Sequence, residues 1–286
     1  MPVSRSFCLL FSVTLMAFWN ASNSAVHAQP ARPEPAVEDT ILEALQNKIL
    51  VWNTDTSVAR RRVANHRFVQ DLGRLIRSDV AWDFPWSELH PVSALNSPDG
   101  QWKILTWSVQ LEQNARRHYG CLFDQEGRLY PLLDQQANRF EVDTIYEGQQ
   151  WPGAVYIEIL PYTATHAGLP CYAVIGYDAR EPFCQRKVVD WVCPDTLQNR
   201  ALVGAPLIRV GPKTQTRLQL IYPRDVRVQM NWDQEQGLIF FDHLISRGLD
   251  PSSADFDYIP DGTFDGLVWE KGALVFKEIP NYQPSR

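Results

Sequence analysis

Residues 226–241 have the sequence Val-Arg-Val-Gln-Met-Asn-Trp-Asp-Gln-Glu-Gln-Gly-Leu-Ile-Phe-Phe, and this stretch decides the fold class. From Val226 to Trp232 every second residue is apolar and the residues between are polar, a two-residue period typical of a β-strand with one buried face. The polar run from Asp233 to Gly237 favours a chain reversal, because glycine adopts positive φ without steric cost. Apolar residues then return, which predicts an antiparallel hairpin.

The same pattern continues towards the C-terminus. Three further apolar runs, at 256–259, 267–269 and 274–276, are separated by the turn sequences Pro260-Asp261-Gly262 and Glu270-Lys271-Gly272. Proline presets φ and glycine permits positive φ, so both sequences are predicted to reverse the chain. The C-terminal third is therefore predicted to be an antiparallel β-meander.

Strand patterns extend from residue 91 to the C-terminus, and helical patterns precede them. Apolar spacing of three and four residues predicts one helix from Val37 and a second from about Val58 to Ile76. The buried side of the second helix is expected to carry Val63, Val69, Leu72 and Ile76, whereas Arg60, Arg61 and Arg62 are expected to be solvated surface.

We predict a mainly β fold, in which residues 37–90 form a helical segment packed on a sheet and residues 91–286 form the β domain. The antiparallel meander is expected to form a sandwich or a strongly curved sheet. Strand groups of about 40 residues leave a propeller-like arrangement as the second choice.

The N-terminus has the pattern of a secretory signal peptide. Arg5 precedes an apolar run from Phe7 to Trp19, and Val26-His27-Ala28 fits a small-residue cleavage rule. The apolar run is shorter than the roughly 20 residues that span a membrane. We therefore predict a signal peptide at 1–28, a proline-containing linker at 29–36, and a mature chain without a transmembrane span in the periplasm or outside the cell.

The net charge of the chain limits the classes of partner that we expect. The chain has 27 lysines and arginines against 33 acids, a formal net charge of −6. No basic stripe stands out in the sequence, so nucleic acid is not an expected partner. An envelope protein or a glycan is the expected class of partner.

Four cysteines remain after the predicted cleavage. An even number in an oxidising compartment favours disulfides. Three pairings are possible among Cys121, Cys171, Cys184 and Cys193; the first choice is Cys184 with Cys193 and Cys121 with Cys171. Zinc is not expected, because no two cysteines have the spacing of a zinc site.

Asp242 and His243 are adjacent, and a carboxylate could orient an imidazole as a general base. Neighbouring strand residues point to opposite faces, however, so these two side chains are not expected to meet.

Asp261 and Asp265, with Asp255 and Asp257, could supply oxygen ligands to calcium. A turn stabilised by its own aspartate explains the same residues more simply. Asp242, His243, Asp261 and Asp265 therefore remain site candidates, with no catalytic residue, metal or cofactor assigned.

Aromatic side chains near predicted turns and strand ends offer a different hypothesis. Rigid aromatic rings lose little entropy on binding and could form a recognition surface, although core packing is the more common role. The residues concerned are Trp82, Trp86, Trp102, Trp151 and Tyr162.

Two C-terminal motifs resemble those of a group of exported bacterial proteins to which no activity is assigned. The motifs are Phe241-Asp242-His243-Leu244 and Tyr258-Ile259-Pro260-Asp261-Gly262-Thr263-Phe264-Asp265-Gly266. Ser97-Pro98-Asp99-Gly100 with Trp107 looks like an upstream feature of the same group. The resemblance covers residues 95–278 and implies export and a β-rich domain. It implies no catalytic residues.

These observations favour an exported, non-catalytic protein that binds or assembles in the envelope. The alternative is a secreted hydrolase, carbohydrate-active for example, that uses carboxylates at strand ends. Serine-hydrolase motifs, zinc-protease motifs and glycine-rich phosphate loops are absent from the sequence.

Overall fold

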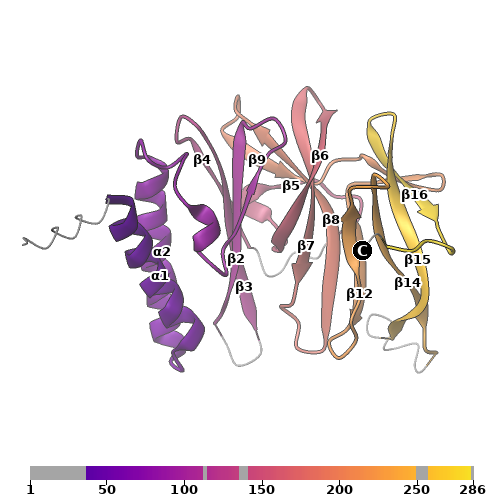
Figure 1. Ribbon diagram of the computed structural model, residues 1–286, viewed down its shortest axis with the longest axis horizontal. Coiled ribbons are helices and arrows are strands. Elements are labelled where there is room, and N and C mark those ends of the chain that lie inside the picture. Colours follow the sequence, from indigo (N-terminus) through magenta and orange to yellow (C-terminus); the bar gives the residue numbers. More distant parts are fainter. Residues whose placement is uncertain (1–36, 112–114, 135–140, 249–256, 285–286) are drawn as a thin grey trace, which may run out of the picture. The chain divides into compact units, whose positions relative to one another are not determined.

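The computed structural model describes residues 37–111, 115–134, 141–248 and 257–284. These residues form two helices and three β-sheets, so the predicted mainly β class is confirmed (Figure 1). The predicted signal peptide and linker lie outside the described residues, as do Asp255 and Phe256.

The two predicted helices are α1 (Val37–Thr54) and α2 (Val58–Ile76). Ser57 caps α2, because its side chain accepts a hydrogen bond from the Arg60 backbone N–H. Two of the four residues predicted to be buried in α2 are instead exposed, Val63 by 49% and Val69 by 40%. The buried stripe is set by other positions of the same helix: Ala64, Phe68, Leu72, Leu75 and Ile76.

Sheet A is an antiparallel meander with the order β1-β2-β3-β4. Its strands are β1 (Ser93–Asn96), β2 (Trp102–Gln110), β3 (Arg116–Asp124) and β4 (Leu129–Leu133), and a short 3-10 helix, η1 (Trp86–Glu88), precedes it. The predicted turn between β1 and β2 is present, since Ser97 Oγ accepts from the backbone N–H of Gln101 and Trp102, and Gly100 has a φ of +67°.

Sheet B has the order β5-β9-β8-β7-β6, and β12 also pairs with β8. Its strands are β5 (Tyr146–Glu147), β6 (Val155–His166), β7 (Leu169–Asp178), β8 (Cys184–Asp195), β9 (Arg200–Val203) and β12 (Leu218–Pro223), with the 3-10 helix η2 (Gly148–Gln150) after β5. Strand β8 is long enough for β12 to pair with its first half and β9 with its end.

Sheet C has the order β11-β10-β16-β15-β14-β13. Its strands are β10 (Ile208–Val210), β11 (Lys213–Gln215), β13 (Met230–Asp233), β14 (Leu238–Ser246), β15 (Tyr258–Glu270) and β16 (Ala273–Glu278). The hairpin predicted at 226–241 is the β13–β14 pair, although its first strand begins at Met230. Unlike its neighbours, β10 runs parallel to β16.

The chain reversal predicted at Pro260-Asp261-Gly262 is wrong. These residues lie inside β15, where the pairing with β14 passes from Phe264–Asp242 to Pro260–Leu244. Three residues of β15 thus face His243 alone, which is a β-bulge. Asp261 Oδ1 accepts from both the N–H and the hydroxyl of Thr263, so this turn-forming chemistry bends the strand without reversing it.

Three apolar clusters lie between successive layers. The first packs α1 and α2 against one face of sheet A, for example through Phe68 and Trp107. The second lies between the other face of sheet A and sheet B, and includes Leu122 and Tyr172. The third lies between sheet B and sheet C. The layers follow one another in the order helices, sheet A, sheet B and sheet C (Figure 1).

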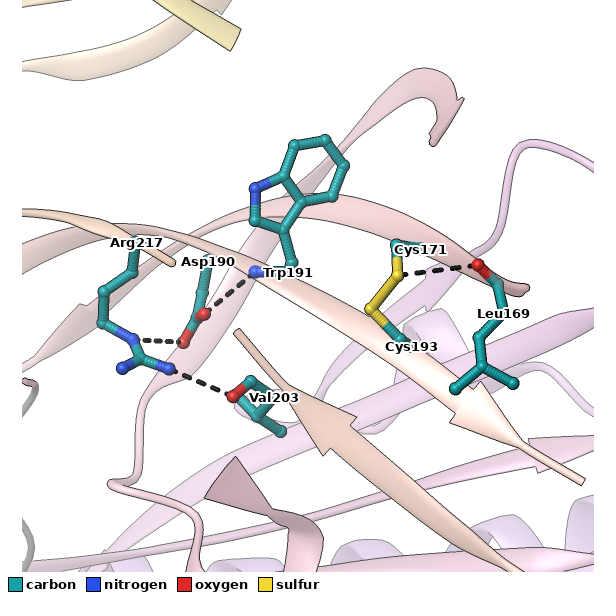
Figure 2. Close-up of a disulfide and its surroundings, with 7 residues drawn as sticks. All are labelled: Leu169, Cys171, Asp190, Trp191, Cys193, Val203 and Arg217. Carbon is teal, nitrogen blue, oxygen red and sulfur yellow. Dashed lines mark hydrogen bonds and ion pairs between the residues drawn. A yellow bond between two sulfur atoms is a disulfide. The ribbon is translucent and has the colours of Figure 1, made fainter. Parts of the chain in front are cut away.

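The predicted cysteine pairing is wrong. The disulfide joins Cys171 of β7 to Cys193 of β8, neighbours across two antiparallel strands with their Cα atoms 4.2 Å apart (Figure 2). Cys184 begins the strand that Cys193 nearly ends, so an extended backbone of about 3.3 Å per residue keeps them far apart. Cys121 is buried between the helices and sheet A, whereas Cys171 belongs to the cluster between sheets B and C.

Candidate functional site

The structure brings two of the four predicted site residues into contact. His243 Nδ1 lies 2.8 Å from Asp265 Oδ2, between β14 and β15. Asp265 pairs in register with Phe241, so it is the diagonal neighbour of His243 on the same face. The side chain of His243 is 42% exposed and that of Asp265 is 10% exposed. The pair is therefore accessible from solvent.

The surrounding charge favours the protonated imidazole. The hydrogen bond that Asp265 accepts raises the pKa of His243, and the negative charges of Asp265, Asp261 and Glu278 act in the same direction. Asp261 is itself held ionised, because hydrogen bonds from Thr263 lower its pKa. The site can thus orient an imidazole and, at acidic pH, hold a positive charge among carboxylates.

Asp242 does not join this pair. Its carboxylate accepts a hydrogen bond of 2.6 Å from the backbone N–H of Gln229, which ties the start of β13 to β14. Burial raises the pKa of Asp242. The expectation that Asp242 and His243 would not meet therefore agrees with the contacts, but the partner of His243 was missed because the bulge opposite it leaves no mark in local spacing.

Metal binding at the predicted acids was the other hypothesis. Asp257 accepts a hydrogen bond from the Ser246 hydroxyl and forms an ion pair with Arg247, and Asp261 accepts a hydrogen bond from the Thr263 hydroxyl. Among the residues that the structure describes, no group of three or more His, Cys, Asp or Glu side chains is arranged to hold a metal ion.

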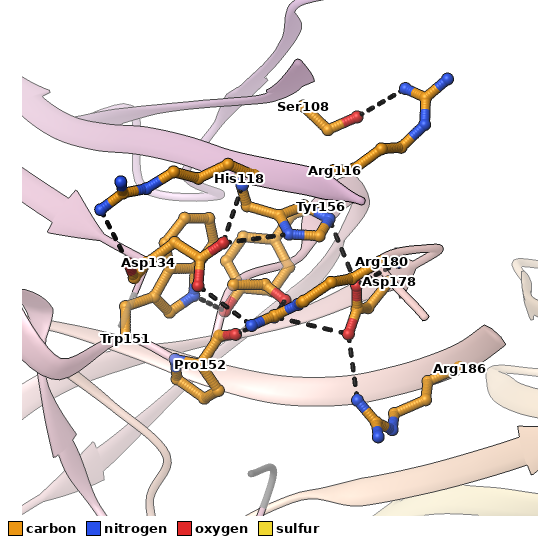
Figure 3. A network of polar contacts seen from close by, with 12 residues as sticks. Ser108, Arg116, His118, Asp134, Trp151, Pro152, Tyr156, Asp178, Arg180 and Arg186 are labelled. Atoms are coloured by element: carbon orange, nitrogen blue, oxygen red, sulfur yellow. Dashed lines mark hydrogen bonds and ion pairs between the residues drawn. The ribbon is translucent and has the colours of Figure 1, made fainter. Parts of the chain in front are cut away.

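A cluster of charged side chains that the sequence analysis missed lies between sheets A and B (Figure 3). His118 of β3 is 1% exposed, and its two ring nitrogens each lie 3.5 Å from a carboxylate, Asp134 on one side and Asp178 on the other. Arg180 bonds both aspartates, at 3.1 Å and 3.5 Å, and Arg186 lies 3.1 Å from Asp178.

A second buried ion pair lies in the same interface. Arg217, fully buried, is 3.4 Å from Asp190 of β8 (Figure 2). Burial raises the pKa of Asp190, against the opposing charge of Arg217. Tyr156 connects the two sets of polar groups. Its hydroxyl lies 3.4 Å from Asp190 and accepts a hydrogen bond of 3.0 Å from Trp151 Nε1. The Trp151 ring in turn packs against the His118 ring.

The cluster around His118 joins the two sheets, because His118 and Asp134 belong to the sheet A side and Asp178 and Arg180 to the sheet B side. Asp134, Asp178 and Asp190 each lie within 3.5 Å of an arginine, and the side chains of these aspartates and of His118 are 1% exposed or less. A substrate has no access to such groups, so their role is structural. The sequence did carry a signal, since Asp190 alternates with the inward-facing Val188 and Val192 and so occupies a buried position.

An apolar groove of about 660 Å³ lies between α1 and α2. Ala44, Val51, Ala59 and Val63 line it, and Lys48, Arg60 and Arg67 also border it. We call it the α1–α2 groove. Leu50 and Val51, on α1, are 58% and 36% exposed. Such clustering of apolar side chains on a surface helix is a mark of interaction sites.

The aromatic recognition surface is not supported. Trp86, Trp102 and Trp151 are 5% exposed or less, and Trp82 is partly buried against the helix-side core. Tyr162 stacks on Trp269, with the ring centroids 5.0 Å apart. These rings serve packing.

Comparisons of the chain with protein-family models, with curated proteins and with solved structures found no match. None of the described helices is long and apolar enough to cross a membrane.

Proposed function

We propose that the mature chain is an exported, non-catalytic binding protein that captures an acidic, apolar-faced segment of an envelope protein in the α1–α2 groove. The observation that carries this proposal is the groove itself, which combines an apolar lining with Lys48, Arg60 and Arg67. The Cys171–Cys193 disulfide and the signal-peptide pattern support the exported compartment.

Charge argues for the acidic character of the partner. The whole chain has a net charge of −6, but α2 has five arginines and a single acid, Asp71. Lys48 is bonded to Asp71 and Arg60 to Asp55, whereas Arg67 has no ion pair with any residue that the structure describes. A carboxylate on the partner would meet this charge.

The apolar lining argues for a peptide over a glycan. Glycan recognition relies on polar hydrogen-bonding groups and exposed aromatic platforms. Of the aromatic residues named above, three tryptophans are buried, and Trp82 and Tyr162 are partly buried against the core. An amphipathic helix that lays leucine-like side chains into a groove between two helices is an established recognition mode.

The test uses the mature protein and a labelled peptide probe, an amphipathic helix with leucine on one face and glutamate on the other, followed by fluorescence anisotropy. Val63→Asp and Arg67→Gln should each weaken binding about tenfold, since one buries a carboxylate in the groove and the other removes a cation. Val69→Asp is the matched control, because Val69 is an exposed valine of the same helix outside the groove. Equal affinity for a lysine-faced peptide would contradict the proposal.

A second candidate, a secreted hydrolase, has one observation in its favour. The 2.8 Å contact of His243 Nδ1 with Asp265 is the arrangement that orients a general base. Screening the mature protein with chromogenic esters and glycosides tests it: a hydrolase should lose its activity in His243→Asn and keep it in His66→Asn, an exposed histidine of α2.

A further inference from the structure

A second cavity, separate from the α1–α2 groove, lies on the other flank of α2. It measures about 370 Å³ and is formed where α2 faces β3 and the ends of β2 and β4. Its polar side is made by Arg62, Arg117 and Tyr119, and its apolar side by Val69, Leu111 and Leu133. We call it the α2–β3 cavity. Its size is that of a small-molecule site.

The hydroxyl of Tyr119 is held so that it can donate a hydrogen bond. Trp107 Nε1 donates to Asn65 Oδ1 at 2.9 Å, which fixes the orientation of the Asn65 amide. The remaining amide nitrogen of Asn65 is the group that hydrogen-bonds the Tyr119 oxygen. The Tyr119 hydrogen is therefore left for another acceptor. The ring cannot turn away easily, because it stacks on Trp107 at 5.7 Å.

Two guanidinium groups act on the same hydroxyl. Burial raises the pKa of Tyr119, so the hydroxyl keeps its proton, while the positive charges of Arg117 and Arg62 oppose this shift. Arg117 is positioned by a hydrogen bond of 3.3 Å to the carbonyl of Asp134. The Asp134 carboxylate itself is engaged with the His118 backbone N–H and with Arg180. None of the described residues that line the cavity is acidic.

His66 also borders the cavity. Its Nε2 lies 3.1 Å from the Gln70 amide nitrogen. On α2, His66 lies one helical turn after Arg62, and both residues line the cavity. The guanidinium groups of Arg62 and Arg117 are charged donors and therefore favour an anionic acceptor.

We propose that the α2–β3 cavity binds a small amphipathic organic anion, with its carboxylate or phosphate head on Arg62, Arg117 and Tyr119. A short apolar body then packs on Val69, Leu111 and Leu133, two of which expose 40% and 45% of their surface without a ligand. The cavity is too small for the helical peptide proposed above, and the two sites share no lining residue.

Isothermal titration of the mature protein with decanoate, decyl phosphate, inorganic phosphate and decanol tests the proposal. Decanoate or decyl phosphate should bind at least about tenfold more tightly than decanol, which lacks the charge, and than phosphate, which lacks the apolar body. Preference between the two anions identifies the head group. Equal binding of decanol, or of inorganic phosphate, would overturn the proposal, as would the absence of binding by both amphipathic anions.

Variants separate this site from the α1–α2 groove. Arg117→Gln and Tyr119→Phe should each weaken binding of the anion about tenfold, and Tyr119→Phe keeps the ring that stacks on Trp107. Arg67→Gln is the matched control, an arginine of α2 that lines the groove but not the cavity, and it should leave anion binding unchanged. Thermal melting confirms that each variant is folded. If Arg67→Gln weakened anion binding as much as Arg117→Gln, the assigned site would be wrong.

Discussion

Arg180 Nη1 lies 3.1 Å from Asp134 Oδ1, and this ion pair joins a residue just beyond β4 of sheet A to one just beyond β7 of sheet B. The same guanidinium donates to the carbonyls of Pro152 and Gly153, so it is bonded on several sides (Figure 3). Apolar packing between two sheets tolerates sliding more readily than directional bonds do. The buried charges therefore fix how sheet A is placed on sheet B.

Replacing Arg180 tests this role. Arg180→Met should lower the free energy of unfolding by about 3–5 kcal/mol, because it leaves the buried Asp134 carboxylate without its arginine partner, whereas Asp178 keeps Arg186. Lys48→Met is the control: it removes a partly exposed ion pair with Asp71 and should cost less than about 1 kcal/mol. Urea unfolding measures both. Equal losses would show that the buried cluster contributes no more than a surface pair.

Thiol counting tests the disulfide. The mature chain, denatured without reductant, should expose two reactive thiols, those of Cys121 and Cys184, and four after reduction. In the native protein Cys121 should react slowly, because burial raises the pKa of its thiol to about 12. A denatured chain with no reactive thiol would instead support a second disulfide.

A glycine beside the second ion pair gives a matched comparison. Gly204 has a φ of +95°, and a Cβ there would lie 2.6 Å from an Arg217 guanidinium nitrogen. Gly204→Ala should therefore lower the free energy of unfolding by about 3 kcal/mol or more, because it strains the backbone and displaces a buried charge. Gly211 has a φ of +57° and open space around it, so Gly211→Ala should lower the free energy of unfolding by only about 1–2 kcal/mol. Chemical unfolding of both variants gives the difference.

The His243–Asp265 pair predicts a pH dependence. Because Asp265 raises the pKa of His243 in the folded chain, the pair stabilises the fold below the unfolded-state value of about 6.5 and loses this contribution as the pH rises through the folded-state pKa. An NMR titration of the His243 ring should therefore give a pKa above about 6.5. Asp265→Asn should lower the pKa of His243 more than Asp261→Asn does, since Asp265 accepts the hydrogen bond from the ring. An unchanged pKa in Asp265→Asn would contradict the assignment.

The sequence predicted the elements better than their assembly. The period from Val58 to Ile76 marked α2, and the alternation ending at Trp232 marked the β13–β14 hairpin, since both depend on neighbours in the chain. Three stacked sheets and the parallel β10–β16 pair depend on contacts between distant segments. Local spacing contains no record of these contacts.

The candidate sites show the same division. His243 and Asp265 were both selected, but their contact depends on the bulge at 261–263, which the Pro-Asp-Gly pattern suggested would be a chain reversal. The α1–α2 groove could not be predicted while Val63 was assigned to the buried stripe. A shift of one residue, about 100° around a helix, was enough to move it to the surface.

The parallel pairing of β10 with β16 has a consequence for biosynthesis. Leu274 emerges from the ribosome 66 residues after its partner Ile208, yet β16 occupies an interior place in sheet C, between β10 and β15. Until β16 has been synthesised, the facing edges of β10 and β15 stay open to pairing with other chains. Completion of this layer thus depends on β16, and a chain truncated before Ala273 should be prone to aggregate.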